Sequence, residues 1–177
     1  MTRNKEEGFT LIELLIVVAI ISIIAAIAVP GLLRARMTGN ETSAIASLKV
    51  TTSSQVAYLA SCGNGSYAAT YQVLGTAPAG STEAFISADL GHAAPITKSG
   101  YNFTMVMSAG GAAGVVDCNA TPTVSGYFAA AAPQQFGTSG TRHFAVNAGN
   151  TIWQDTSNTV LPDPLPLVAA GTVAPVQ

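Results

Sequence analysis

The chain has 177 residues, of which 49% are hydrophobic and 9% are charged, and its formal net charge is −2. Soluble domains carry about 25% charged residues, so this is not the composition of a typical cytosolic enzyme. The sequence has no basic tail or cluster of lysines and arginines, which binding to a phosphate backbone requires, so we expect no direct nucleic-acid site. The length allows about one domain, and the apolar content excludes a disordered chain.

The apolar residues are concentrated near the N-terminus. Residues 9–33 read FTLIELLIVVAIISIIAAIAVPGLL, and Glu13 is the only ionisable side chain among them. Because about 20 apolar residues in a helix span a bilayer core, this stretch predicts a transmembrane helix. Arg3 and Lys5 precede it, and positive charge on that side predicts that the N-terminus stays in the cytoplasm.

Three interpretations fit this apolar segment. It has the features of a signal peptide cut after the small-residue run 26–28, of a plain single-span anchor, and of a helix in which Glu13 has a function. A carboxylate at membrane depth costs about 2.5–3.5 kcal/mol, so Glu13 needs a partner. No Lys, Arg or His lies between Lys5 and Arg34, so we expect that partner outside the same helix.

The run Gly8-Phe9-Thr10-Leu11-Ile12-Glu13, followed by the long apolar stretch, resembles the class III leader of type IV pilins and type II secretion pseudopilins. In that family a prepilin peptidase cuts after the glycine, here Gly8, and methylates the new N-terminal amine, here on Phe9. The family's glutamate corresponds to Glu13, and its proposed role is to neutralise the N-terminal ammonium of a neighbouring subunit. Burying both charges together avoids two separate desolvation penalties. The family's helix-kinking proline corresponds to Pro30, which Gly31 follows.

The resemblance, which is specific over residues 8–33, also implies partners and a location. It implies a homopolymer of identical subunits, processed by the prepilin peptidase and built by an inner-membrane assembly platform with its cytoplasmic ATPase. The precursor is expected in the bacterial inner membrane, and the mature protein in an extracellular pilus or a periplasmic pseudopilus. The expected order is a leader (1–8), a transmembrane and assembly helix (9–33), an amphipathic helix continuing into the head (34–62), and a globular α+β head with a Pro-rich tail (63–177).

The residues after the apolar stretch predict a continuation of the helix. We expect one helix from Phe9 to about Leu59, bent or locally melted between Pro30 and Gly39, because proline removes a backbone hydrogen bond and glycine weakens a helix. The spacing of apolar residues predicts a buried face at Met37, Ile45, Leu48, Val56 and Leu59. The opposite, polar face is expected to hold Ser43, Ser47, Lys49, Ser53 and Ser54.

The rest of the chain predicts a small antiparallel sheet. Residues 64–99 indicate loops with a short helix near Tyr67–Leu74. Alternating segments between turn residues predict strands at Tyr101–Met107, Gly126–Ala131, Arg142–Asn147 and Thr151–Asp155. The turn at 148–150 is typical of a hairpin between the last two. The tail from Leu161 holds several prolines and cannot supply central strands.

These elements predict an α+β fold, in which the second half of a long N-terminal helix packs on a small antiparallel β-sheet head. The first half would be the transmembrane segment and filament core. Phe144 and Trp153 would lie on paired strands and cover the helix face that carries Val56 and Leu59.

The two cysteines, Cys62 and Cys118, suggest a disulfide because the chain is expected to be exported. Closing a loop of this length would contribute about 4 kcal/mol in the chain-entropy model. Two buried free thiols are the alternative.

Catalytic and metal-binding motifs are not evident. His92 and His143 have no cysteine or carboxylate at metal-ligand spacing, and we interpret His143 as an exposed strand residue. The sequence has neither a Gly-x-Ser-x-Gly elbow nor a phosphate-binding loop, although a spatial Ser-His-Asp arrangement leaves no sequence signature and stays open. We therefore expect no enzyme, no cofactor and no metal.

Two functions remain. The first is a structural subunit of a type IV pilus-like filament that serves adhesion, motility or DNA uptake. The second is a pseudopilin of a type II secretion system, which drives protein export. The head from residue 50 onward carries only seven charged residues, and this sparsely charged surface favours the pilus because it suits a densely packed polymer.

Overall fold

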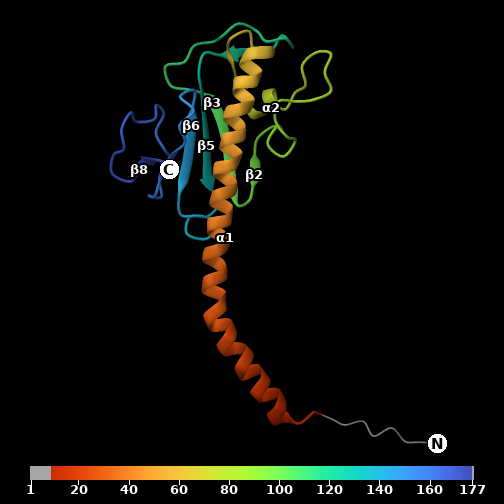
Figure 1. Cartoon of the computed structure of the whole chain (residues 1–177), viewed down its shortest axis with the longest axis vertical. Helices are drawn as coiled ribbons and strands as arrows, with labels where there is room; N and C mark the ends of the chain where they lie inside the picture. Colours follow the sequence, from red (N-terminus) through yellow and green to blue (C-terminus); the bar gives the residue numbers. More distant parts are fainter. Residues whose placement is uncertain (1–8, 177) are drawn as a thin grey trace, which may run out of the picture. The chain divides into compact units, whose positions relative to one another are not determined.

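The computed structural model describes residues 9–176, which contain two helices and eight strands (Figure 1). The chain divides into two compact units, one ending at Arg36 and the other beginning at Met37. Each unit is described by itself, and the second, called the head below, contains the sheet.

Helix α1 extends from Leu11 to Ser61. The sequence predicted a helix from Phe9 to about Leu59, and the structure confirms both ends to within two residues. The expected local melting between Pro30 and Gly39 is wrong, because every residue in that range is helical. Pro30 removes a single backbone hydrogen bond, and the remaining bonds of this long helix keep it continuous.

Within the head, α1 buries a face that is mostly polar. The buried positions recur every three or four residues, at Glu41, Ala44, Ser47, Leu48, Thr51, Ser54, Gln55 and Tyr58. The predicted apolar face is only partly correct. Leu48 is buried and Ile45 packs against the core, but Val56 is 51% exposed. Ser47 and Ser54, which were expected on the polar face, are buried. The polar side chains are stable there because they find partners. Ser54 Oγ donates to the Phe85 carbonyl at 2.7 Å, and the Gln55 amide exchanges two 2.9 Å hydrogen bonds with the backbone of Ala68.

The described part of the head contains a six-stranded antiparallel sheet with the spatial order β2-β3-β5-β6-β7-β8. Its strands are β2 (Ile96–Lys98), β3 (Tyr101–Met107), β5 (Tyr127–Pro133), β6 (His143–Asn147), β7 (Trp153–Asp155) and β8 (Val173–Pro175). The four predicted strands are present as β3, β5, β6 and β7. The predicted β6–β7 hairpin is also confirmed, and the Asn150 N–H donates to the Asn147 carbonyl at 3.0 Å in its turn. The α+β class is confirmed.

Several short elements were not predicted. Strand β1 (Tyr67–Ala68) pairs with β4 (Thr123–Val124) as a separate two-stranded sheet. Helix α2 therefore covers only Tyr71–Leu74, the second half of the short helix expected from the sequence. Thr70 caps α2, because its side chain accepts a hydrogen bond from the Val73 N–H. Strands β1 and β4 are short and far apart in the chain, so no local sequence pattern predicts their pairing.

The sheet has an apolar core on each face. Figure 1 shows α1 crossing one face, where the core includes Leu48, Tyr58, Phe103 and Phe144. The core on the other face consists of Phe128, Ala130, Ala145, Trp153, Leu161 and Leu165. The expectation that Phe144 and Trp153 together cover one helix face is wrong. Trp153 pairs with Ala145, and neighbouring residues of a strand point to opposite faces.

Candidate assembly site

The N-terminal end of α1 carries a reciprocal cap built from two side chains. The Thr10 N–H donates to Glu13 Oε2 at 2.9 Å, and the Glu13 N–H donates to Thr10 Oγ1 at 3.3 Å. The Thr10 hydroxyl also donates to Glu13 Oε2. This is a capping box, which satisfies backbone N–H groups that the first helical turn leaves without partners. The carboxylate therefore lies where the positive end of the helix dipole stabilises it.

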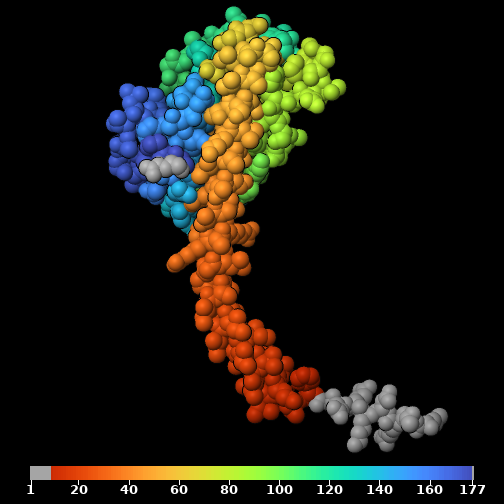
Figure 2. Space-filling view, in the orientation of Figure 1, coloured from red at the N-terminus to blue at the C-terminus, as the bar shows by residue number. Residues whose placement is uncertain are grey.

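The remainder of the first unit is an apolar helix whose side chains are uncovered. Its most apolar 18-residue window has a mean hydropathy of 3.0, and none of that window is buried (Figure 2). Leu11 is 80% exposed, and Leu32 is still 69% exposed. The exposed side chains lie all around the helix, so no single soluble partner face accounts for them. By length and composition this helix is able to cross a membrane.

Pro30 and Gly31 lie inside the apolar part of α1. A Cβ atom added at Gly31 would meet nothing within 4 Å, so no contact within this chain requires glycine there. The role of Pro30 and Gly31 as a kink stays a prediction from the resemblance.

In the head, an ion pair ties α1 to the sheet. Glu41 is 5% exposed and accepts hydrogen bonds from the Thr141 N–H at 2.7 Å and from Arg142 Nε and Nη2 at 2.9 and 2.7 Å. Arg142 Nη1 also donates to Gln154 on β7 at 2.7 Å. Burial alone would raise the pKa of Glu41, but the Thr141 N–H and the guanidinium more than offset it, so the pKa lies below its usual value.

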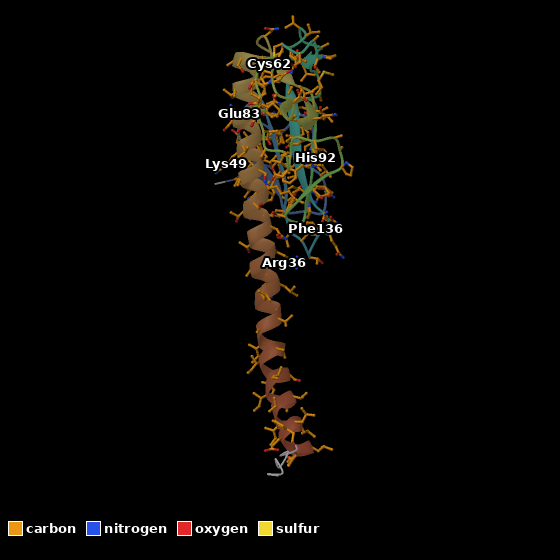
Figure 3. All side chains as sticks on the ribbon, turned by 90° about the vertical axis from the view of Figure 1, so that its right-hand side faces the viewer. Arg36, Lys49, Cys62, Glu83, His92 and Phe136 are labelled. Atoms are coloured by element: carbon orange, nitrogen blue, oxygen red, sulfur yellow. A yellow bond between two sulfur atoms is a disulfide. The ribbon has the colours of Figure 1, made fainter. Side chains whose placement is uncertain are left out.

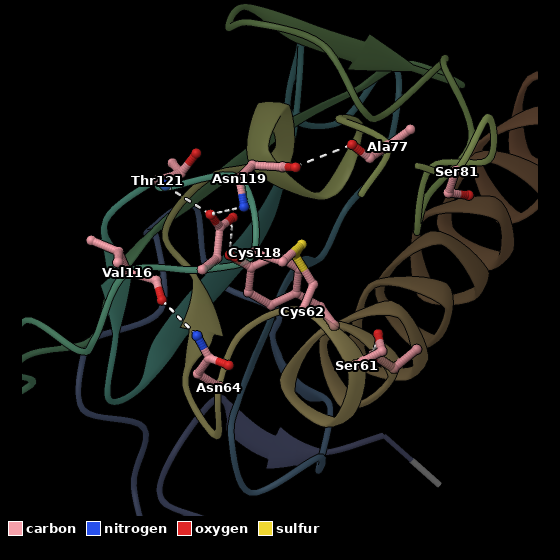
Figure 4. Close-up of a disulfide and its surroundings, with 12 residues drawn as sticks. Ser61, Cys62, Asn64, Ala77, Ser81, Val116, Cys118, Asn119 and Thr121 are labelled. Atoms are coloured by element: carbon pink, nitrogen blue, oxygen red, sulfur yellow. Dashed lines mark hydrogen bonds between the residues drawn. A yellow bond between two sulfur atoms is a disulfide. The ribbon is translucent and has the colours of Figure 1, made fainter. Parts of the chain in front are cut away.

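The C-terminal end of α1 is held by a disulfide and a buried hydrogen bond (Figure 4). Cys62 and Cys118 are joined, and the Cys118 N–H donates to the Cys62 carbonyl at 2.9 Å. The Tyr58 hydroxyl donates to Asp117 Oδ2 at 2.7 Å, while Asp117 Oδ1 accepts from the Thr121 N–H, also at 2.7 Å. Burial and the Asp117 carboxylate raise the pKa of Tyr58. These contacts fix the end of the helix against the loop between β3 and β4.

Neither histidine belongs to a cluster of metal-ligating side chains in the part of the chain that the structure describes. Among residues 9–176, no group of three or more His, Cys, Asp or Glu side chains is arranged to hold a metal ion. His92 is exposed, but His143 is only 6% exposed and stacks on Phe136, with ring centroids 5.9 Å apart. The interpretation of His143 as an exposed strand residue is wrong, because it lies on the face of β6 opposite the buried Phe144 core, and that face is covered as well.

Comparison with known proteins agrees with the N-terminal motif. The family described as the prokaryotic N-terminal methylation motif matches residues 3–29. Over 120 residues the chain is 38% identical to the type IV wide pilus major component PilA4 of Thermus thermophilus, covering 68% of this chain and 84% of that relative. The chain belongs to the type IV pilin family. No solved structure matches this pilin.

Family membership confirms the resemblance carried by residues 8–33 and makes this pilin a structural pilus subunit. Of the predicted site residues, Gly8 lies outside the described residues, so the cleavage position stays a prediction. Phe9 is described and is 84% exposed. Thr10 is a partner of Glu13 that the sequence reasoning missed by considering only charged residues. Its signal was present, since Thr-x-x-Glu before an apolar run is typical of a capping box.

Proposed function

We propose that this pilin polymerises through α1 into an extracellular type IV pilus, after a prepilin peptidase removes residues 1–8 and methylates Phe9. The exposed apolar surface of residues 11–33 carries this proposal. Apolar surface in water costs about 25 cal/mol per Å², so a helix that is apolar all round requires cover. The inner membrane provides it for the precursor, and α1 helices of neighbouring copies provide it in the filament.

Glu13 is the proposed charge partner of the Phe9 amine of a neighbouring copy. Both hydrogen bonds donated by Thr10 go to Oε2 of the carboxylate. In the described chain, Oε1 accepts no hydrogen bond, so it is available to an ammonium group from outside. The capping box would orient the carboxylate for this contact rather than compete with it.

Family membership supports the proposed partners of assembly. They are further copies of this chain, the prepilin peptidase, and an inner-membrane platform with its cytoplasmic ATPase. The matched relative is by its name the major component of a wide type IV pilus, which favours a pilus over a secretion pseudopilus for this chain. A structural role in the filament requires no catalytic chemistry.

The test compares two substitutions that affect the helix end differently. Glu13→Ala removes the carboxylate, so we expect processing to continue but filaments in the sheared surface fraction to be lost. Thr10→Val is the matched control, because it removes the two capping-box hydrogen bonds of the Thr10 hydroxyl and keeps the carboxylate, and we expect it to retain most filaments. Electron microscopy and immunoblotting of sheared fibres give the readout.

A normal filament yield from Glu13→Ala would contradict the charge-pairing proposal. Equal losses in both variants would assign Glu13 to capping alone. In the same assay Gly8→Lys should accumulate the full-length precursor, and an unchanged mature mass would refute cleavage after Gly8. A protein-export defect on deletion, without any surface fibres, would favour the pseudopilus.

A further inference from the structure

The head has few charged side chains, and all but two of them have partners among the described residues. Between residues 37 and 176, the partnered groups are Glu41 with Arg142, Asp89 with Lys98, Asp117 with Tyr58, Asp155 with Thr159, and Asp163 with the Ala109 N–H. The remaining two are Lys49 and Glu83, which are both exposed. They are one exposed cation and one exposed anion that form no ion pair with the described residues.

Lys49 lies on a face of α1 that the head leaves uncovered. Val50 and Val56, on the same stretch of helix, are 47% and 51% exposed. A shallow groove lined by Thr52, Ser53, Val56 and Asn150 runs beside them. Figure 2 shows this part of α1 at the surface of the head, where a neighbouring copy can reach it.

Glu83 lies in the loop after α2, at a higher level along α1 than Lys49. The Ser54 hydroxyl, which donates to the Phe85 carbonyl, attaches this loop to α1 five residues beyond Lys49. At 1.5 Å per residue, five residues correspond to about 7.5 Å along the helix. Figure 3 accordingly shows Glu83 above Lys49, and no ion pair joins them within one chain.

We propose that Lys49 of one copy pairs with Glu83 of the next copy in the filament. This inference rests on the proposed polymerisation. Within the head, the loop that carries Glu83 is attached about 7.5 Å beyond Lys49 along α1. A neighbouring head that is displaced by about this distance toward the C-terminal end of α1 therefore brings its Lys49 to the level of Glu83.

Such a contact uses different surfaces on the two copies. Each copy offers its lysine to one neighbour and its glutamate to another, so the contact is heterologous and continues along an open assembly. Exposed ion pairs contribute little affinity individually, but they disfavour wrong registers, because a shifted neighbour meets an unpaired or like charge. The pair therefore sets the register between heads, while the apolar helices provide most of the attraction.

Cross-linking in assembled filaments tests this contact directly. The variant with both Lys49→Cys and Glu83→Cys is assembled, sheared, and treated with a short bismaleimide. We expect a ladder of covalent multimers extending beyond the dimer on denaturing gels. The matched controls are the two single-cysteine variants, which can form no chain of cross-links and should give no species larger than a dimer.

Charge reversal tests the pairing itself. Lys49→Glu and Glu83→Lys should each reduce the pelleted filament fraction at low salt by about five-fold, because each places like charges together. The variant carrying both substitutions should recover most of that loss. Wild-type filament yield from both single variants, together with no ladder, would overturn the inference while leaving polymerisation intact. If the unmodified chain forms no filaments, the proposed function and this inference both fail.

Discussion

Removing the carboxylate that ties α1 to the sheet should destabilise the head. In Glu41→Ala, the Thr141 N–H and the Arg142 guanidinium lose acceptors now 2.7–2.9 Å away. Breaking a buried ion pair costs about 3–5 kcal/mol. The Arg142 side chain is 31% exposed and regains water, so we expect the free energy of unfolding to fall by about 2–3 kcal/mol. For a domain of this size, that lowers Tm by about 5–10 °C.

Thermal unfolding of the full chain in detergent, followed by near-UV circular dichroism, measures this effect. Trp153 is buried in the head and reports its tertiary packing. The Tm of Glu41→Gln should fall less than the Tm of Glu41→Ala, because the amide oxygen of glutamine still accepts a hydrogen bond. Glu83→Ala is the matched control, since its carboxylate is exposed and unpaired in the head, and it should change Tm little. Equal Tm values for Glu41→Ala and Glu83→Ala would refute this account of how α1 is anchored.

Three further predictions concern the head. Replacing Cys62 and Cys118 by serine should lower the free energy of unfolding by about 4 kcal/mol, and an unchanged denaturant midpoint would contradict this. Burial lowers the pKa of His143 from 6.5, so stability should fall as pH drops below that value, and His143→Phe should flatten the dependence in thermal melts. Burial alone would raise the pKa of Asp155, but hydrogen bonds led by the Ser157 N–H lower this pKa to about 2. The stabilisation from the Asp155 carboxylate should therefore be lost as the pH falls from about 4 toward 2, and Asp155→Asn should abolish this pH dependence of the free energy of unfolding.

The sequence predicted the features that depend on local pattern. The apolar run indicated a helix, and the structure has it from Leu11 to Ser61, continuous through Pro30. Alternation between turn residues located β3, β5, β6 and β7. These predictions succeeded because each element repeats its signal over several neighbouring residues.

The buried face of α1 was not predictable from periodicity, because its members are largely polar. Thr51 and Gln55 are fully buried and hydrogen bonded, to Tyr71 and Ala68. The anchor between Glu41 and Arg142 joins residues 101 positions apart, so no local spacing reveals it. At the assembly end, the family resemblance identified Glu13, but only the structure showed that Thr10 already engages one of its two carboxylate oxygens.

The central claim is that this chain is a processed pilus subunit that assembles through the apolar part of α1. The most direct test is the intact mass and N-terminal sequence of the subunit recovered from sheared surface filaments. We predict a chain that begins at N-methylated Phe9 and retains residues 9–33. A mature chain that begins at Val29, or filaments that lack this chain, would contradict the account.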